Sequence, residues 1–207
     1  MNHSKAEAIN LLQQENPQSW NKNRSIFPRT PEGLIDLTDI ELEELSLEGI
    51  DLSEVDLSRS RFKSVNFTAS SFYKSSLVRC SFYDCNLSFC DFSYSSCYAS
   101  IFIENQQNEE ASFYKASLKY SIFERCDWTS VVFIRTNFAR ANIKNTKFIG
   151  CSFRGCNMNY TKIESTEFEV CHSLSKIKNK PKSIDSERER SSILDVVKEA
   201  KIRKYKA

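Results

Sequence analysis

Apolar residues recur along most of this chain at every fifth position. The series starts at Leu37, reaches Phe102 without a miss, and resumes one residue out of phase at Phe113 to run to Phe168. From Ser60 onward, the position two residues before each apolar one holds Ser, Thr, Ala, Cys or Val. Neither an α-helix nor a flat strand has a period of five. The pattern predicts a chain that turns a corner every five residues and stacks on itself, with the large and the small residue both inward.

This repeat resembles the consensus of the pentapeptide-repeat family, in which a small and a polar residue precede Leu or Phe and two variable positions follow. The segments SEVDLSRSRF and ARANIKNTKF fit it closely, and the resemblance covers about residues 35–171. It implies an all-β solenoid, a right-handed quadrilateral β-helix of about seven coils with four pentapeptides to a coil. With paired strands about 4.8 Å apart, the rod would be a little over 30 Å long. The polar stretch 105–110 predicts a small bulge or loop on one face.

Both ends of such a rod expose unpaired backbone and are expected to carry short α-helical caps. Residues 1–34 are predicted to form the N-terminal cap, because Ser4 and Glu7 make a capping-box pattern ahead of an apolar helix face. This segment also resembles a leader that often precedes bacterial pentapeptide repeats, through Leu11, Leu12, Trp20, Asn21 and Arg24. The β-helix itself is assigned to residues 35–172.

The C-terminal region divides into two parts. Residues 173–185 are a Lys-rich linker, for which contact with nucleic acid or an anionic membrane is an alternative. Residues 186–207 begin with a second capping box and predict a C-terminal helix with one apolar stripe, formed by Ile193, Leu194, Val197 and Ile202. This helix either covers the last coil or joins two copies as a homodimer, as the resemblance to some family members suggests.

Eight cysteines raise the question of a metal site or disulfides. Structural zinc sites favour gaps of about two to four residues within a ligand pair. The tempting groups here have gaps of five, which is the repeat itself: Cys80, Cys85 and Cys90, and Cys151 with Cys156. We therefore expect buried, reduced cysteines that act as small apolar residues, and no metal, disulfide or other cofactor.

Outward side chains lie at the corners, one and two residues after each apolar position. We number the faces of a coil by their first apolar residues, Leu37, Leu42, Leu47 and Leu52, as faces one to four. The corners that follow faces four and one collect most of the cations and tyrosines. Because Tyr and Arg are enriched at protein interfaces, we predict a protein-binding surface there. Its candidate residues are Tyr73, Tyr94, Tyr114, Arg79 and Arg140, and the alternative is that tyrosines simply suit a β surface.

Acidic corner residues gather on faces two and three and in the first coils. No Lys or Arg lies between Thr30 and Ser58. The first coils are therefore expected to be strongly negative, with an acidic patch of Glu43, Glu44, Glu48 and Glu54.

The main functional hypothesis is a non-enzymatic protein-protein interaction scaffold with an unidentified protein partner. An exported bacterial effector is one form of it, because some secreted effectors resemble this architecture. A second hypothesis, implied by resemblance to quinolone-resistance members of the family, is a DNA-mimicking regulator or protector of DNA gyrase or topoisomerase IV. A net charge of +2 departs from the acidic rod that this role implies. A nucleic-acid-binding rod is a third hypothesis, which the near-neutral charge disfavours.

Several classes of function find no support in the sequence. It has no phosphate-binding glycine loop, His-based triad or metal-spaced ligand set, so we predict that the protein is not an enzyme. No apolar run approaches the roughly 18 residues that a membrane span requires. The N-terminal residues lack the apolar core of a secretory signal, which predicts a cytoplasmic protein, or one exported into a host cell without a classical signal peptide.

Overall fold

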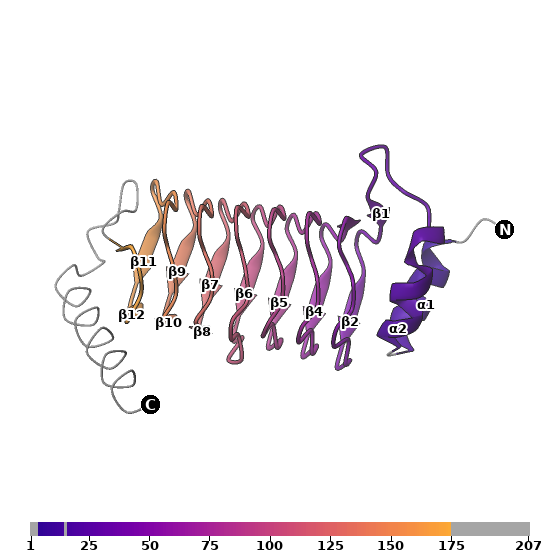
Figure 1. Ribbon diagram of the computed structural model, residues 1–207, viewed down its shortest axis with the longest axis horizontal. Helices are drawn as coiled ribbons and strands as arrows, with labels where there is room; N and C mark the ends of the chain where they lie inside the picture. Colours follow the sequence, from indigo (N-terminus) through magenta and orange to yellow (C-terminus); the bar gives the residue numbers. More distant parts are fainter. Residues whose placement is uncertain (1–3, 15, 175–207) are drawn as a thin grey trace, which may run out of the picture.

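The protein is a four-sided parallel β-solenoid of about seven turns with helices at its N-terminal end (Figure 1). The structure is a computed structural model that describes residues 4–14 and 16–174. Strands of successive turns lie side by side along the rod, and α1 and α2 lie at the end that carries β2. The solenoid and its N-terminal helices confirm the predicted fold class. The predicted C-terminal helix and most of the Lys-rich linker lie outside the described residues.

Three faces of the solenoid contain regular strands. On face two, seven strands pair in parallel: β2 (Glu41–Glu43), β4 (Arg61–Lys63), β5 (Ser81–Tyr83), β6 (Ile101–Ile103), β7 (Ile122–Glu124), β9 (Asn142–Lys144) and β11 (Lys162–Glu164). Face three holds β8 (Asp127–Thr129), β10 (Lys147–Ile149) and β12 (Glu167–Glu169), and face one begins with β1 (Ile35–Asp36) and β3 (Val55–Asp56). Elsewhere, isolated parallel bridges join one turn to the next.

The register places each apolar repeat residue on its counterpart one turn away. Phe62 pairs with Phe82, 20 residues later, and Phe102 pairs with Phe123, 21 residues later, because the interruption adds one residue. On face four, Phe92 stacks between Phe72 and Phe113, with ring centroids 4.6 Å and 4.5 Å apart. All three side chains are fully buried. The inward direction predicted for the apolar position of the repeat is confirmed.

Every corner contains a residue in the left-handed backbone region, two positions after the apolar one. Asp39, Tyr94 and Arg140, for example, have φ angles of 57°, 60° and 61°. Left-handed backbone costs a non-glycine residue roughly 1–2 kcal/mol, and the ladder of hydrogen bonds between turns offsets that cost. The chain therefore makes its corners with only 4 glycines. It also holds side chains of any size outward at these positions, which leaves them free to form a binding surface.

The interruption is a bulge of one residue, and it places two asparagines inside the rod. Asn86 pairs with Gln107, whereas the Cys85 amide donates to Asn105 Oδ1, so the extra residue falls at Gln106. Asn105 occupies the small inward position and Asn108 the apolar one, and both are buried. Asn108 Nδ2 donates to the backbone oxygens of Asn105 and Asp127, at 2.6 Å and 2.9 Å. The polar stretch is therefore partly interior, because amide side chains substitute for the missing backbone hydrogen bonds.

Two helices cover the first turn. α1 (Lys5–Gln13) starts with the predicted capping box of Ser4 and Glu7, and buries Ala8 and Leu12 against the solenoid. α2 (Pro17–Asn23) continues into the 3-10 helix η1 (Arg24–Ile26). These elements form the cap predicted for the N-terminal segment.

The leader residues Trp20, Asn21 and Arg24 hydrogen-bond the backbone of the first face-four segment. Trp20 Nε1 donates to the Asp51 oxygen at 2.7 Å. Asn21 accepts from the Asp51 amide at 2.7 Å and donates to the Gly49 oxygen at 3.0 Å. Arg24 pairs with the Asp51 carboxylate at 2.6 Å and also donates to the Ser53 oxygen. The cap thus satisfies polar backbone groups that have no preceding turn to pair with.

Candidate interaction surface

Aromatic and cationic side chains line two corners of the rod. The first corner follows face four, and the second follows face one. We call the two together the tyrosine-cation stripe, which consists of Tyr73, Lys74, Arg79, Tyr94, Tyr98, Tyr114, Lys115, Lys119, Tyr120, Arg135, Arg140, Arg154 and Tyr160. Neighbours across the stripe come from turns that are stacked on one another, so residues about 20 positions apart meet.

On the first corner, three tyrosines form a ladder that holds lysines over its rings. Tyr94 makes edge-to-face contacts with Tyr73 and Tyr114, at centroid distances of 5.7 Å and 5.6 Å. Lys115 Nζ lies 4.9 Å from the Tyr94 ring centre and 5.1 Å from that of Tyr114. It also donates a hydrogen bond to the Tyr94 hydroxyl at 3.2 Å. These contacts fix the side chains in place before any partner arrives.

The protonation states of this cluster favour a positive surface. Hydrogen bonding to the Tyr94 and Tyr114 hydroxyls raises the pKa of the Lys115 ammonium above its ordinary value. Partial desolvation on its own would raise the pKa of Tyr114, but hydrogen bonding to Lys115 and the charges of Lys115 and Arg135 lower it overall. Lys115 is therefore fully charged at neutral pH.

On the second corner, an arginine lies between two rings. The Arg140 guanidinium carbon is 5.5 Å from the Tyr120 ring centre and 5.7 Å from that of Tyr160, and Nη1 donates to the Tyr120 hydroxyl at 2.9 Å. Tyr98 extends this second ladder, with its ring 5.3 Å from Tyr120. Tyr160 is 80% exposed, which is unusual for so large a ring.

The predicted binding residues fall into two groups in the structure. Tyr73, Tyr94 and Tyr114 are in contact with one another, whereas Arg140 belongs to the second corner. Arg79 also lies on the second corner, where its amide donates to the Tyr98 oxygen of the next turn. The prediction left out Tyr120 and Tyr160, which hold Arg140. The sequence does place Tyr120, Arg140 and Tyr160 on one corner, because they are 20 positions apart, but it does not show that their side chains touch.

Charge separates the stripe from the opposite side of the rod. After the bulge, faces four and one comprise residues 111–120, 131–140 and 151–160, and these contain no Asp or Glu. The same segments carry Lys115, Lys119, Arg135, Arg140 and Arg154, and Lys162 follows at the start of the neighbouring face-two strand. Within the described part of the chain, none of these six cations forms an ion pair. This side is a continuous positive surface.

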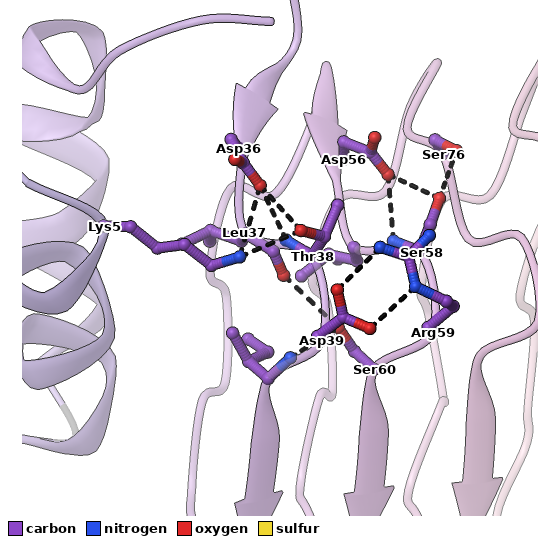
Figure 2. A network of polar contacts seen from close by, with 12 residues as sticks. Lys5, Asp36, Leu37, Thr38, Asp39, Asp56, Ser58, Arg59, Ser60 and Ser76 are labelled. Atoms are coloured by element: carbon purple, nitrogen blue, oxygen red, sulfur yellow. Dashed lines mark hydrogen bonds and ion pairs between the residues drawn. The ribbon is translucent and has the colours of Figure 1, made fainter.

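Acidic residues of the first turns are largely neutralised by neighbouring bases. Lys5 from α1 pairs with Asp36 at 3.4 Å, and Arg59 from the next turn pairs with Asp39 at 2.6 Å (Figure 2). Arg24, Arg29, Arg61 and Lys63 pair in the same way with Asp51, Glu54, Glu41 and Glu43. The first coils are therefore less negative than expected, because most of the carboxylates there have a basic partner.

The predicted acidic patch is divided among three corners. Glu43 and Glu44 follow face two, Glu48 follows face three, and Glu54 follows face four. Residues only a few positions apart point to different sides of the rod, because the chain turns at every fifth residue. These four glutamates therefore do not form a single surface.

All eight cysteines are buried free thiols. Burial raises the pKa of Cys85, Cys97, Cys126 and Cys156 to about 12, and the pKa of Cys80 and Cys90 is also raised. Among the residues described, no cluster of His, Cys, Asp or Glu has the arrangement needed to hold a metal ion. The same residues include no helix with the length and apolar character to span a membrane.

Comparison with known families agrees with this geometry. The sequence profile described as pentapeptide repeats matches residues 35–72, 60–95, 111–148 and 136–169, with 8 copies. The chain belongs to the pentapeptide repeat family. The matched segments leave out the stretch that contains the bulge, where the pentapeptide repeat is interrupted. Comparison with curated proteins gives no match.

Solved structures similar to this pentapeptide repeat protein share little sequence with it. One is QnrB1, a plasmid-mediated fluoroquinolone resistance protein, with 15% identity over 66% of this chain and 74% of that chain and a TM-score of 0.44. Rfr23 from the cyanobacterium Cyanothece 51142 has 17% identity over 65% and 87%, with a TM-score of 0.31. HetL from Nostoc, a pentapeptide repeat protein involved in heterocyst differentiation regulation, has 14% identity over 79% and 97%, with a TM-score of 0.27.

Proposed function

We propose that this pentapeptide repeat protein is a non-enzymatic scaffold that binds a protein partner along the tyrosine-cation stripe. The observation that carries the proposal is the combination of exposed or half-buried, mutually packed tyrosines with cations that have no acidic partner among the described residues. Ion pairs neutralise most cations elsewhere on the rod, as Lys63 and Arg125 show. Cations that lack such pairs are available for a partner.

The chemistry of the stripe suits protein recognition. Tyr and Arg are enriched among the residues that contribute most to interface energy. Ring and cation contacts already restrict the side chains, so binding would lose less conformational entropy than ordering free lysines would. Solenoid rods offer long surfaces of this kind, because each turn repeats the same geometry.

The two other hypotheses have less support from this surface. Binding to single strands of nucleic acid uses free aromatic faces on which bases stack. Here Lys74 and Lys115 lie over the rings of the first corner, and Arg140 lies over those of the second. A DNA mimic for gyrase or topoisomerase IV needs negative charge, whereas faces four and one of the last turns carry none. An exported effector remains one form of the scaffold proposal.

A triple substitution tests the proposal. Tyr73→Ser, Tyr94→Ser and Tyr114→Ser together remove the ladder of the first corner, and we expect loss of most of the partner captured from bacterial or eukaryotic lysate. A matched control is Tyr83→Ser with Phe89→Ser, which removes two exposed rings, 40% and 50% exposed, from other corners. The control should keep the partner. Both variants should melt within a few degrees of the parent, because surface changes cost roughly 0.5 kcal/mol each.

Other outcomes would contradict the proposal. If the triple variant still captured the partner, the first corner would not be part of the interface. A large fall in its melting temperature would show that these tyrosines stabilise the fold. Inhibition of gyrase supercoiling by the protein, assayed in parallel and unaffected by the triple substitution, would favour the DNA-mimic hypothesis instead.

A further inference from the structure

The second corner contains a hollow with cationic and aromatic walls, and we propose that it is a carboxylate-binding subsite centred on Arg140. The group that it takes is a carboxylate of an acidic segment of the partner protein. This inference rests on the proposed scaffold function and adds the chemistry of the partner to it. The hollow measures about 420 Å³ and is lined by Tyr120, Arg140, Ala141, Asn142, Tyr160 and Lys162.

Arg140 is oriented for binding before a ligand arrives. Its guanidinium lies between the rings of Tyr120 and Tyr160, and its Nη1 donates to the Tyr120 hydroxyl. No hydrogen bond from Nε or Nη2 to another described residue is found. One edge of the guanidinium is thus anchored, and the other donors are free. A planar fork of free N–H groups matches the two oxygens of a carboxylate.

Lys162 supplies a second positive charge to the same hollow. It has no ion pair with any described residue, and none of the lining residues is acidic. The nearby Glu164 instead pairs with Lys144, at 3.6 Å, and follows face two. An anion that enters the hollow therefore meets two cations and the Asn142 amide without facing a carboxylate. Lys162 pairs with Asn142 of the preceding turn, two positions after Arg140, so both cations line the same hollow and act on one anion together.

The walls favour a carboxylate on a protein over a nucleic acid. The guanidinium contacts both the Tyr120 and Tyr160 rings, so the space between them is not available for a stacking base. The adjoining turns of faces four and one contain no acidic residues, so a segment with several Asp or Glu residues meets favourable charge along its length.

The test uses the full chain and fluorescein-labelled hexaglutamate, followed by fluorescence anisotropy at low salt. We expect saturable binding that Arg140→Gln weakens about tenfold or more, which corresponds to about 1.4 kcal/mol. Lys162→Gln should weaken it severalfold. Arg140→Lys keeps the charge but loses the fork, so it should fall between the parent and Arg140→Gln. The matched control is Lys144→Gln, which removes a cation that is already ion-paired and should leave binding unchanged.

Further probes distinguish the source of the anion. Hexaglutamate with an amidated C-terminus should bind as well as the free acid if side-chain carboxylates occupy the subsite, and much more weakly if the terminal carboxylate does. Tighter binding of a phosphoserine peptide or of oligothymidylate than of hexaglutamate would overturn the assignment to carboxylates. Absence of hexaglutamate binding, or equal weakening by Lys144→Gln and Arg140→Gln, would overturn the subsite itself.

The result can be separated from that of the scaffold proposal. If the triple tyrosine variant loses its partner but Arg140→Gln neither lowers capture nor changes peptide binding, the scaffold proposal stands and this inference fails. If hexaglutamate binds at Arg140 while the triple variant keeps its partner, the subsite stands and the first corner is excluded from the interface.

Discussion

At the scale of single residues, the side chain at the small inward position donates a hydrogen bond as well as filling space. Cys80 Sγ donates to the Leu57 oxygen, and Cys156 Sγ donates to the Phe133 oxygen, which in each case belongs to the apolar residue 23 positions earlier. Thr161 makes the same contact with Phe138. Ser, Thr and Cys are interchangeable there because each is small and has one donor. This explains why seven of the eight cysteines occupy the small position, whereas Cys97 occupies an apolar one.

Titration of the buried thiols gives a prediction about stability. Burial raises the pKa of Cys85 from its ordinary value of 9.0 to about 12, and Cys126 and Cys156 behave alike. Below about pH 8 the thiols are protonated in both folded and unfolded chains and do not affect the pH dependence. Between about pH 8 and 12 mainly the unfolded chain loses these protons, so the free energy of unfolding should fall as the pH rises.

A triple variant isolates this effect. Cys85→Ala, Cys126→Ala and Cys156→Ala keep a residue type that the small column already uses, as at Ala111. Its melting temperature should decline less steeply than that of the parent above about pH 8, while the two curves run parallel from about pH 7 to pH 8. Parallel curves over the whole range would contradict the assignment of raised thiol pKa values.

At the scale of elements, face four derives its stability from the stacked rings. Phe92 contacts Phe72 and Phe113 in the neighbouring turns and is fully buried. Asp at this position would leave an unpaired charge in the apolar interior and remove the aromatic contacts, with a loss of about 3–5 kcal/mol or more. We expect Phe92→Asp to unfold the rod or to lower its melting temperature by many degrees.

Phe89 provides the control, three positions earlier. It is 50% exposed at a corner, so Phe89→Asp should change the stability by roughly 0.5 kcal/mol or less. Thermal unfolding followed by circular dichroism measures both variants. Equal melting temperatures for Phe92→Asp and the parent would refute the register described above.

At the scale of the whole molecule, charge is distributed unevenly although the net charge is only +2. Lys5, Arg24 and Arg29 from the N-terminal region neutralise carboxylates of the first turns. The cations on faces four and one of the later turns have no acidic partner among the described residues. The rod therefore has a positive side that its overall composition conceals.

This asymmetry predicts a salt-sensitive interaction. Raising NaCl from about 0.05 M to 0.5 M shortens the Debye length to a few ångströms, so capture of the partner should fall substantially. Substituting Lys115→Gln with Arg140→Gln should reduce both the capture and its dependence on salt, whereas the ion-paired control Lys63→Gln with Lys144→Gln should not. Capture that is indifferent to salt would show that the cations make no electrostatic contribution to binding.

The five-residue period by itself determined the solenoid, its inward columns and the outward corners. A large and a small inward residue in every five are both buried when the chain turns a corner every five residues and stacks on itself. The coil of four pentapeptides that the family resemblance implied then indicated which two faces carry tyrosines and cations. The leader residues Trp20, Asn21 and Arg24 were recognised by resemblance, but their hydrogen bonds to the first turn were not visible in the sequence.

Tertiary structure alone decided which side chains meet across turns. The bulge at Gln106 shifts the stacking distance from 20 to 21 residues, and this shift moves Asn105 and Asn108 into the interior. Contacts of Arg140 with Tyr120 and Tyr160 depend on side-chain orientation between separate turns. The period could not reveal these features, because it specifies the direction of each side chain from its own backbone, whereas a contact also depends on the neighbour that the stacked turn brings beside it.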